Sequence, residues 1–392
     1  MLKELDSQYV LPTYGRQDIA FVKGDNATLT DSEGKEYIDF MSGIAVVSVG
    51  HANSTLSKAL CEQIHNITHI SNLYLIEPQA KAAEAIVKAS GYDMQCFFGN
   101  SGAEANEGAI KIARKYGEVD GQAKRYKIIT LEHSFHGRTI TTVKATGQES
   151  MHNYFGPFPD GFVYAKDIDE IEGLLDDHTV AVMIELVQGE GGVQPLDRDK
   201  VQALAKLLKS RNILLIVDEV QTGVYRTGEF LASNLYDIEP DIVTLAKGLG
   251  GGVPIGVVMT SLKDTLKAGD HGSTFGGNYL SATAAKTVIE ILNDYKESGA
   301  LDEAFIYFEK GLSALHVSFP EIFLESVGFG MMRGLRVKDA DTLGKIINSA
   351  REEGVMVLKA GKNTLRLLPP LTITKGEMDE GFTRLTRAIA AV

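Results

Sequence analysis

The sequence predicts an α/β fold, with one large domain built on a mostly parallel sheet with helices on both faces, and a smaller α+β domain. Three observations predict this fold. The chain has 392 residues, which is too long for one ordinary core. From about residue 90 to residue 260, short apolar runs alternate with helical patterns. Within the runs, apolar and polar residues do not alternate, which is typical of strands covered on both faces.

The first segment, residues 1–60, contains a hairpin pattern. Two short β-rich runs, residues 28–30 and 37–40, flank the polar turn Asp31-Ser32-Glu33-Gly34. We expect this segment to belong to the smaller domain.

The central segment, residues 61–284, is expected to form the large domain. Its predicted strands are residues 95–98, 128–131, 180–187, 213–217, 242–245 and 256–259. Two helical patterns each place apolar residues on one face, with Ala105, Ala109, Ile112, Ala113 and Tyr116 in the first and Val201, Leu204, Leu207 and Leu208 in the second. Ligands of such sheets bind outside the carboxyl ends of the strands, so the motifs that follow the runs are expected to form one site.

The last segment, residues 285–392, mixes helical patterns with short strands near residues 322–327, 331–337 and 364–368. We expect it to combine with residues 1–60 into the smaller domain.

Composition excludes several classes of function. The chain is 44% hydrophobic and 23% charged, as globular proteins are, and its net charge is −13. An acidic chain without a basic block is a poor candidate for binding nucleic acid or a membrane surface. Two cysteines, Cys61 and Cys96, cannot form a disulfide framework or a cysteine zinc site, and we expect both to be buried in a reducing compartment. No targeting or membrane segment is recognisable, so a cytoplasmic location is expected.

A phosphate site is one interpretation of the motif Asn100-Ser101-Gly102-Ala103, which follows a predicted strand and opens a helix. Gly102 allows close approach of a ligand, and the first N–H groups of a helix bind anions. The alternative is a strand–helix turn in which Ser101 is only the helix cap. His133 and His136 are three residues apart but have no third ligand nearby in the sequence, so no metal site is predicted.

Two charged residues end apolar strands 29 positions apart, Asp218 after residues 213–217 and Lys247 after residues 242–245. A desolvated lysine is a nucleophile able to form a Schiff base, and a buried aspartate needs a cationic partner. The two residues could simply form an ion pair. Together with the phosphate motif and Phe135 as a stacking face, however, they fit pyridoxal 5′-phosphate, which uses a lysine, an aspartate at its ring nitrogen and a phosphate site.

Several longer motifs resemble those of class III pyridoxal-phosphate aminotransferases over essentially the whole chain. They are NSGAEANEGAIKIARKY, HSFHGRTITTVKATGQ, ELVQGEGGVQP, LLIVDEVQTG, PDIVTLAKGLGGGVPIG, HGSTFGGN and LRLLPPLTI. Within that class they are most similar to the acetylornithine and succinylornithine aminotransferases. The resemblance implies pyridoxal-phosphate-dependent transferase fold type I.

The resemblance also implies a role for each cofactor-binding residue. Lys247 forms the internal aldimine and carries protons, and Asp218 keeps the pyridine nitrogen protonated. Gln221 binds the phenolic oxygen, Phe135 stacks on the ring, and Gly102 and Ala103 bind the phosphate. Glu219 and Val220, which lie between Asp218 and Gln221, belong to the same cofactor-binding motif. Thr274 reaches the phosphate of the neighbouring subunit, which implies a homodimer with shared active sites; a plain polar turn at Ser273 and Thr274 is the alternative.

Substrate residues follow from the same resemblance. Arg138 binds the distal carboxylate, Arg366 binds the α-carboxylate of glutamate or 2-oxoglutarate, and Glu190 pairs with Arg366 when the first substrate is bound, with Ser273 as a further substrate contact. The implied reaction is ping-pong transfer from N2-acetylornithine to 2-oxoglutarate, in arginine biosynthesis. For each charged residue the alternative is a structural ion pair or an exposed surface group.

Three positions depart from the pattern of the class, namely Lys144, Tyr225 and Tyr279. They leave open whether the donor is acetylornithine, succinylornithine, ornithine or another ω-amino acid. An aminomutase, and a cofactor-binding regulatory protein without turnover, are the remaining alternatives.

Overall fold

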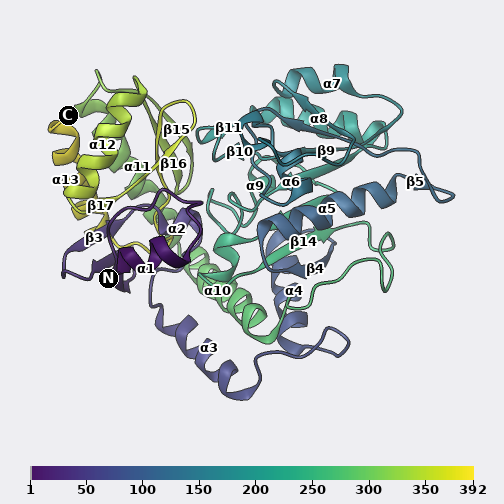
Figure 1. Ribbon diagram of the computed structural model, residues 1–392, viewed down its shortest axis with the longest axis horizontal. Coiled ribbons are helices and arrows are strands. Elements are labelled where there is room, and N and C mark those ends of the chain that lie inside the picture. Colours follow the sequence, from purple (N-terminus) through teal and green to yellow (C-terminus); the bar gives the residue numbers. More distant parts are fainter. Residues whose placement is uncertain (1) are drawn as a thin grey trace.

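The computed structural model describes residues 2–392 and is organised around a seven-stranded sheet in the order β4-β14-β13-β12-β9-β7-β8 (Figure 1). Its strands are β4 (Gln95–Gly99), β7 (Lys127–Leu131), β8 (Phe162–Ala165), β9 (Thr179–Ile184), β12 (Leu214–Asp218), β13 (Ile242–Leu245) and β14 (Gly256–Thr260). Only β14 runs antiparallel to its neighbours in this sheet, and the other adjacent pairs are parallel. The predicted mostly parallel sheet is therefore confirmed.

Helices cover both faces of this sheet, as the continuous apolar runs require. On one face, α5 (Gly102–Tyr116) and α6 (Ile140–Ala145) pack on residues such as Ala181 and Met183. On the other face, α7 (Ile171–Leu174) and α8 (Arg198–Ser210) pack on the alternating residues Val182 and Ile184. Successive strand residues point to opposite faces of the sheet. Consecutive apolar residues are therefore all buried, because helices cover both faces.

The predicted strand at residues 180–187 is wrong in its second half. β9 ends at Ile184, and after Glu185 and Leu186 the chain enters β10 (Val187–Gln188), which pairs with β11 (Gln194–Pro195) in a separate two-stranded sheet. A carboxylate within an apolar run marks the point where the chain leaves the sheet. The sequence interpretation also missed β8, the edge strand beside β7.

Two four-stranded sheets flank the large one, in the orders β1-β2-β3-β17 and β15-β16-β19-β18. Their strands are β1 (Phe21–Asp25), β2 (Thr28–Asp31), β3 (Glu36–Asp39), β15 (Phe323–Phe329), β16 (Met332–Val337), β17 (Val355–Met356), β18 (Leu358–Ala360) and β19 (Thr364–Leu367). The predicted hairpin is the antiparallel β2–β3 pair. β17 pairs in parallel with β3, so the two ends of the chain share one sheet.

The remaining helices join these parts. They are α1 (Leu2–Tyr9), α2 (Ser42–Ala45), α3 (Ser54–Asn66), α4 (Glu77–Ser90), α9 (Ala232–Leu235), α10 (Tyr279–Glu297), α11 (Ala300–Ser318), α12 (Ala340–Glu352) and α13 (Lys375–Ala390), with short 3-10 turns η1 (Glu149–Met151), η2 (Ile168–Glu170) and η3 (Lys247–Gly250) and a small β5–β6 pair (Glu118–Val119, Gln122–Ala123). One apolar core runs from β13 and β14 through α4 and α10 to α11, α12 and α13. The expected segment boundaries near residues 60 and 284 fall inside α3 and α10, and the division stays a prediction.

The expectation that both cysteines are buried is wrong for Cys61, which is exposed on α3. Leu56 is the one fully buried residue of that helix. Cys96, on β4, is partly buried. No helix within residues 2–392 is long and apolar enough to cross a membrane.

Candidate active site

A cavity of about 390 Å³ opens at the carboxyl edge of the large sheet. It is lined by side chains and loops that follow four of the parallel strands, including Gly102, Ala103, Phe135, Arg138, Asp218, Val220, Gln221 and Lys247. These motifs are distant in the sequence and meet because the carboxyl ends of parallel strands share one edge. The expectation of a single convergent site is met for these residues.

The first turn of α5 forms one wall of the cavity. Ser101 caps the helix, since its hydroxyl accepts a hydrogen bond from the Glu104 N–H at 3.2 Å. A Cβ atom built on Gly102 would lie 2.7 Å from Cγ1 of Val220, so a larger residue would require the Val220 side chain to move. The cap satisfies one N–H group and leaves the helix N-terminus suited to an anion. The two interpretations of this motif are therefore compatible.

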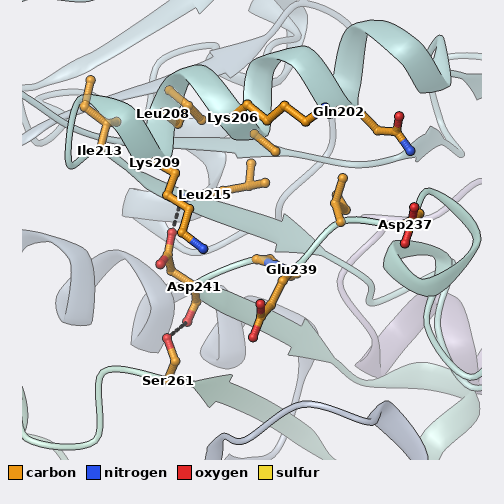
Figure 2. Close-up of a pocket in the computed structure, with 13 residues that line it drawn as sticks. Gln202, Lys206, Leu208, Lys209, Ile213, Leu215, Asp237, Glu239, Asp241 and Ser261 are labelled. Atoms are coloured by element: carbon orange, nitrogen blue, oxygen red, sulfur yellow. Dashed lines mark hydrogen bonds between the residues drawn. The ribbon is translucent and has the colours of Figure 1, made fainter.

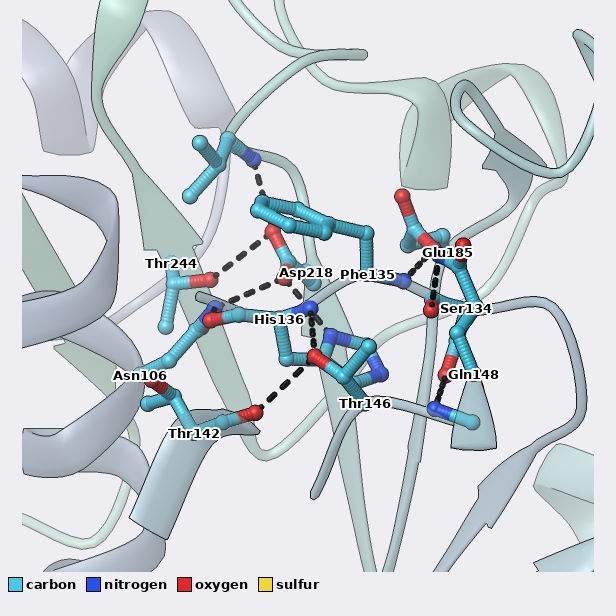
Figure 3. Close-up of polar contacts among 12 residues, drawn as sticks. Asn106, Ser134, Phe135, His136, Thr142, Thr146, Gln148, Glu185, Asp218 and Thr244 are labelled. Carbon is cyan, nitrogen blue, oxygen red and sulfur yellow. Dashed lines mark hydrogen bonds and ion pairs between the residues drawn. The ribbon is translucent and has the colours of Figure 1, made fainter. Parts of the chain in front are cut away.

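Asp218 ends β12 and lies in a dense hydrogen-bond network (Figure 3). Its Oδ2 atom lies 2.8 Å from Nδ1 of His136 and accepts a hydrogen bond from Nδ2 of Asn106 at 2.7 Å. Oδ1 accepts from the Val220 N–H at 3.0 Å and from the Thr244 hydroxyl at 3.4 Å. The carboxylate is only 4% exposed, so these partners fix its orientation and replace the water that it lacks.

Lys247 begins η3 directly after β13 and faces the cavity. Its φ is +44°, a conformation that costs a non-glycine residue about 1–2 kcal/mol. Burial lowers the pKa of its amine below the ordinary value; the nearby Arg366 lowers it further, whereas Glu190, Asp218 and Glu185 raise it. A lowered pKa increases the fraction of neutral, nucleophilic amine at a given pH.

The simple ion pair between Asp218 and Lys247 is not formed. The described chain shows no contact within 4.0 Å between their charged atoms, and Asp218 is paired with His136 instead. Lys247 is therefore left available to a ligand in the cavity.

Phe135 and Arg138, which follow β7, also line the cavity. The Phe135 ring lines the cavity, and the Arg138 guanidinium lies 5.6 Å from the centre of that ring. Arg138 is exposed, so its charge is hydrated and can be reached by a ligand. A planar guanidinium at the mouth of a cavity suits a carboxylate of the ligand.

Arg366, on β19, lies beside the cavity and is held by two predicted residues. Its Nη1 atom donates to Oε1 of Glu190 at 2.7 Å and lies 3.4 Å from Oε1 of Gln221. Arg366 is 2% exposed, and its Nε atom has no hydrogen-bond partner. β19 belongs to one of the flanking sheets, whereas Gln221 follows β12 of the large sheet. Arg366 therefore brings a second guanidinium, besides that of Arg138, to the edge of the site.

Five predicted site residues lie outside the lining of the cavity. Two of them, Glu190 and Arg366, form the ion pair beside it, and the others are Ser273, Thr274 and Glu219. The Ser273 hydroxyl accepts hydrogen bonds from Nδ2 of Asn100 at 3.1 Å and from the Gly276 N–H at 3.0 Å. Thr274 is exposed. The Glu219 carboxylate points into the protein, where it accepts hydrogen bonds from Thr222, from the Ala232 N–H, and from both the N–H and the hydroxyl of Ser233.

The three departures from the family pattern also lie outside the cavity lining. Tyr225 is buried in the core, where its hydroxyl donates to Asn293 at 2.6 Å, so it does not cap the rim of this cavity. The Lys144 amine lies over the ring of Tyr164, 5.3 Å from its centre, and Tyr279 begins α10.

Sequence interpretation missed His136, Asn106 and Glu185, all of which line the cavity. In the sequence, His136 is notable only as a possible metal ligand three residues from His133, whereas in the structure it contacts Asp218. Within residues 2–392 no cluster of three or more possible metal ligands occurs. The available signals were a histidine beside the predicted stacking residue Phe135 and a carboxylate inside an apolar run.

A second cavity, of about 380 Å³, lies at the amino edge of the same sheet, between α8 and the start of β13 (Figure 2). Its charged residues include Lys206, Lys209 and Glu239, all of which are exposed. Asp241 is used internally, since its Oδ2 accepts the Leu215 N–H at 2.8 Å.

Comparison with known proteins assigns the chain to a family. Residues 12–389 match the class III aminotransferase family. The chain belongs to the class III aminotransferases. It is 58% identical to the acetylornithine aminotransferase of Wolinella succinogenes, over the full length of both chains.

Solved structures of the same family have the same fold. An ornithine aminotransferase of Toxoplasma gondii, whose structure has partial occupancy of PLP at the active site, superposes with a TM-score of 0.93 at 34% identity, over 100% of this chain and 94% of that one. An N-acetylornithine aminotransferase of Stenotrophomonas maltophilia gives a TM-score of 0.84 at 34% identity, over 99% and 98% of the two chains.

Proposed function

We propose that this class III aminotransferase uses pyridoxal 5′-phosphate to transfer the terminal amino group of N2-acetyl-L-ornithine to 2-oxoglutarate. The products are N-acetyl-L-glutamate 5-semialdehyde and L-glutamate, which places the reaction in arginine biosynthesis. The similarity to the Wolinella succinogenes acetylornithine aminotransferase supports the donor. The observation that carries the proposal is the meeting of Lys247, Asp218 and the α5 N-terminus in one cavity.

The residues of the cavity fit this cofactor. The glycine cradle at Gly102 and the helix N-terminus suit a phosphate, the buried Asp218 suits a protonated ring nitrogen, and Phe135 offers a flat apolar wall. Gln221, which also lines the cavity, is placed to bind the phenolic oxygen. When bound, the cofactor supplies an aldehyde that accepts the amino group and a ring that delocalises the electrons released at the substrate carbon.

Lys247 is the residue proposed to do the proton transfer. Its lowered pKa favours the neutral amine, which would hold the cofactor and, when free, could take a proton from the substrate carbon. Asp218 holds a negative charge at the ring nitrogen and is kept in place by His136 and Asn106. His136 and Asn106 are thus proposed to act on the reaction by holding Asp218 in place.

Two substrates with differently placed carboxylates must use the same site. For the donor, we propose that Arg138 binds the distal carboxylate, while Glu190 neutralises Arg366 at 2.7 Å. For glutamate and 2-oxoglutarate, Arg366 binds the α-carboxylate and Glu190 is displaced. The side chain of Glu190 is 30% exposed whereas that of Arg366 is 3% exposed, so the glutamate has more room to move.

We further propose a homodimer in which Thr274 completes the phosphate site of the partner subunit, with Ser273 next to it at the edge of the substrate site. The exposure of Thr274, and its position outside the cavity of its own chain, support this arrangement. Light scattering of the purified protein tests the assembly, and a monomer that is fully active would exclude a shared site.

The function is tested by a half-reaction titration without keto acid. The visible absorbance of the loaded enzyme is followed against N2-acetylornithine, N2-succinylornithine and ornithine. Bleaching at the lowest concentration by the acetylated donor is expected. A preference for ornithine or the succinyl compound would keep the chemistry and change the donor, and the absence of any absorbance change with pyridoxal phosphate would contradict the cofactor.

A further inference from the structure

Glu185 is a buried acid at the cavity that the mechanism above does not use. It follows directly after β9, lines the cavity, and is 6% exposed. Its Oε2 atom accepts a hydrogen bond from the Phe135 N–H at 2.9 Å (Figure 3). The side chain therefore holds the backbone of the residue whose ring forms the wall of the cavity.

The surroundings of Glu185 do not favour a charge. No lysine, arginine or histidine of the described chain lies within 4.0 Å of its carboxyl oxygens, and the Phe135 N–H is the one donor found for it. Glu219, which is also buried, accepts four hydrogen bonds instead. A buried carboxylate that lacks a cation and has a single donor is costly, and a carboxylic acid at the same place costs less because it carries no charge.

The charged groups that face Glu185 come from three other segments. They are Asp218 at the end of β12, Glu190 after β10 and Lys247 in η3. Burial first, and then the negative charges of Asp218 and Glu190, raise the pKa of Glu185 well above its usual range, while the Phe135 N–H and Lys247 act in the opposite direction. The two neighbouring acids already have partners in His136 and Arg366.

We propose that Glu185 is a positioning residue that works as an uncharged acid and fixes the Phe135 peptide at the cavity wall. This inference rests on the proposed function, in which the Phe135 ring stacks on the cofactor. In the uncharged state Glu185 does not compete with Asp218 for a positive ring nitrogen, and it does not hold Lys247 as an ammonium ion. The acid therefore contributes the geometry of a hydrogen-bond acceptor without adding a third negative charge.

Two variants separate geometry from charge. Glu185→Gln keeps an acceptor for the Phe135 N–H and has no charge, whereas Glu185→Ala removes the acceptor. We expect the equilibrium dissociation constant for pyridoxal phosphate to change less than about threefold in Glu185→Gln and to increase about tenfold in Glu185→Ala, the size of effect that loss of one buried hydrogen bond has. Equal weakening in both variants would show that the carboxylate charge is needed and would overturn the proposal.

A second readout does not depend on catalysis or on Glu185→Ala folding. A glutamate with a raised pKa in the folded state stabilises the protein fully below its unfolded pKa of about 4.3, and this contribution is lost as pH rises toward the folded pKa. The melting temperature of Glu185→Gln, relative to the natural chain, should therefore increase steadily from pH 5 to pH 8. The exposed Glu321→Gln is the matched control, with an expected difference that does not vary with pH.

If the difference in melting temperature between Glu185→Gln and the natural chain does not change from pH 5 to pH 8, Glu185 is ionised and the inference fails. Failure of this inference can be distinguished from failure of the proposed function. If the natural chain neither binds pyridoxal phosphate nor transaminates, the proposed function fails, whereas the pH dependence of melting reports on Glu185 alone.

Discussion

The two ends of the large sheet carry cavities of nearly the same volume, about 390 Å³ at the carboxyl edge and about 380 Å³ at the amino edge. At the carboxyl edge Asp218 and His136 are buried, 4% and 1% exposed, whereas Arg138 at the mouth of the cavity is exposed. At the amino edge the lysines Lys206 and Lys209 are exposed on α8. The two cavities therefore differ in how exposed their charged groups are and not in their volume.

Burial changes the chemical behaviour of the charged groups. In a poorly hydrated cavity, charge interactions are stronger and pKa values move away from their ordinary range, as burial does for Lys247 and Glu185. Exposed lysines at the amino edge stay hydrated, and solvent screening weakens their interactions with other charges. If this comparison is correct, equivalent substitutions at the two edges have very different effects.

The largest effect is expected at Lys247. Replacing it with alanine removes the group proposed to attach the cofactor and carry the proton, and we expect kcat to fall at least a thousandfold while the chain stays folded. Single-turnover kinetics together with circular dichroism measure the two properties. Near-normal transamination by a folded Lys247→Ala variant would falsify the mechanism.

Asp218→Asn should have the next largest effect. The amide keeps the shape of the side chain but removes the charge expected at the ring nitrogen, and we expect kcat to fall about 10²–10³-fold, as when a preorganised electrostatic contact is lost. The absorbance of the loaded enzyme checks that the cofactor is still bound. A variant that retains both absorbance and kcat would remove Asp218 from its proposed role.

Arg366→Gln should act on only one of the two substrates. We expect KM for 2-oxoglutarate to increase about 30-fold, equivalent to about 2 kcal/mol for the loss of a buried charge-assisted contact. The half-reaction with acetylornithine, in which Arg138 is proposed to bind the carboxylate instead, should change much less. Equal losses in both half-reactions would contradict the division of labour between the two arginines.

The smallest effect is expected at the amino edge. Lys206→Ala and Lys209→Ala remove exposed charges from a cavity of similar size, and both kcat/KM and the free energy of unfolding should stay close to the natural values, within about 0.5 kcal/mol for stability. Steady-state kinetics and denaturant titration provide the measurement. A loss of activity in either variant would show that the cavity of Figure 2 takes part in function.

Much of this arrangement was predictable from local sequence. Continuous apolar runs predicted strands covered on both faces, and motifs after those runs placed Lys247, Asp218 and Gly102 at one edge of the sheet. The prediction failed where a single residue changed the path of the chain, as at Glu185, where the strand was expected to continue. It also failed for Cys61, because hydrophobic character alone does not say which face of a helix is covered.

Sequence predicted where several strands end, as for β7 and β13, because periodicity and apolar runs are local properties of the chain. Only the tertiary structure decided their partners. Asp218 pairs with His136 rather than Lys247, and Arg366 meets Glu190 from a different sheet. These contacts join residues 82 and 176 positions apart, and their strength depends on the burial that packing creates, which no local pattern records.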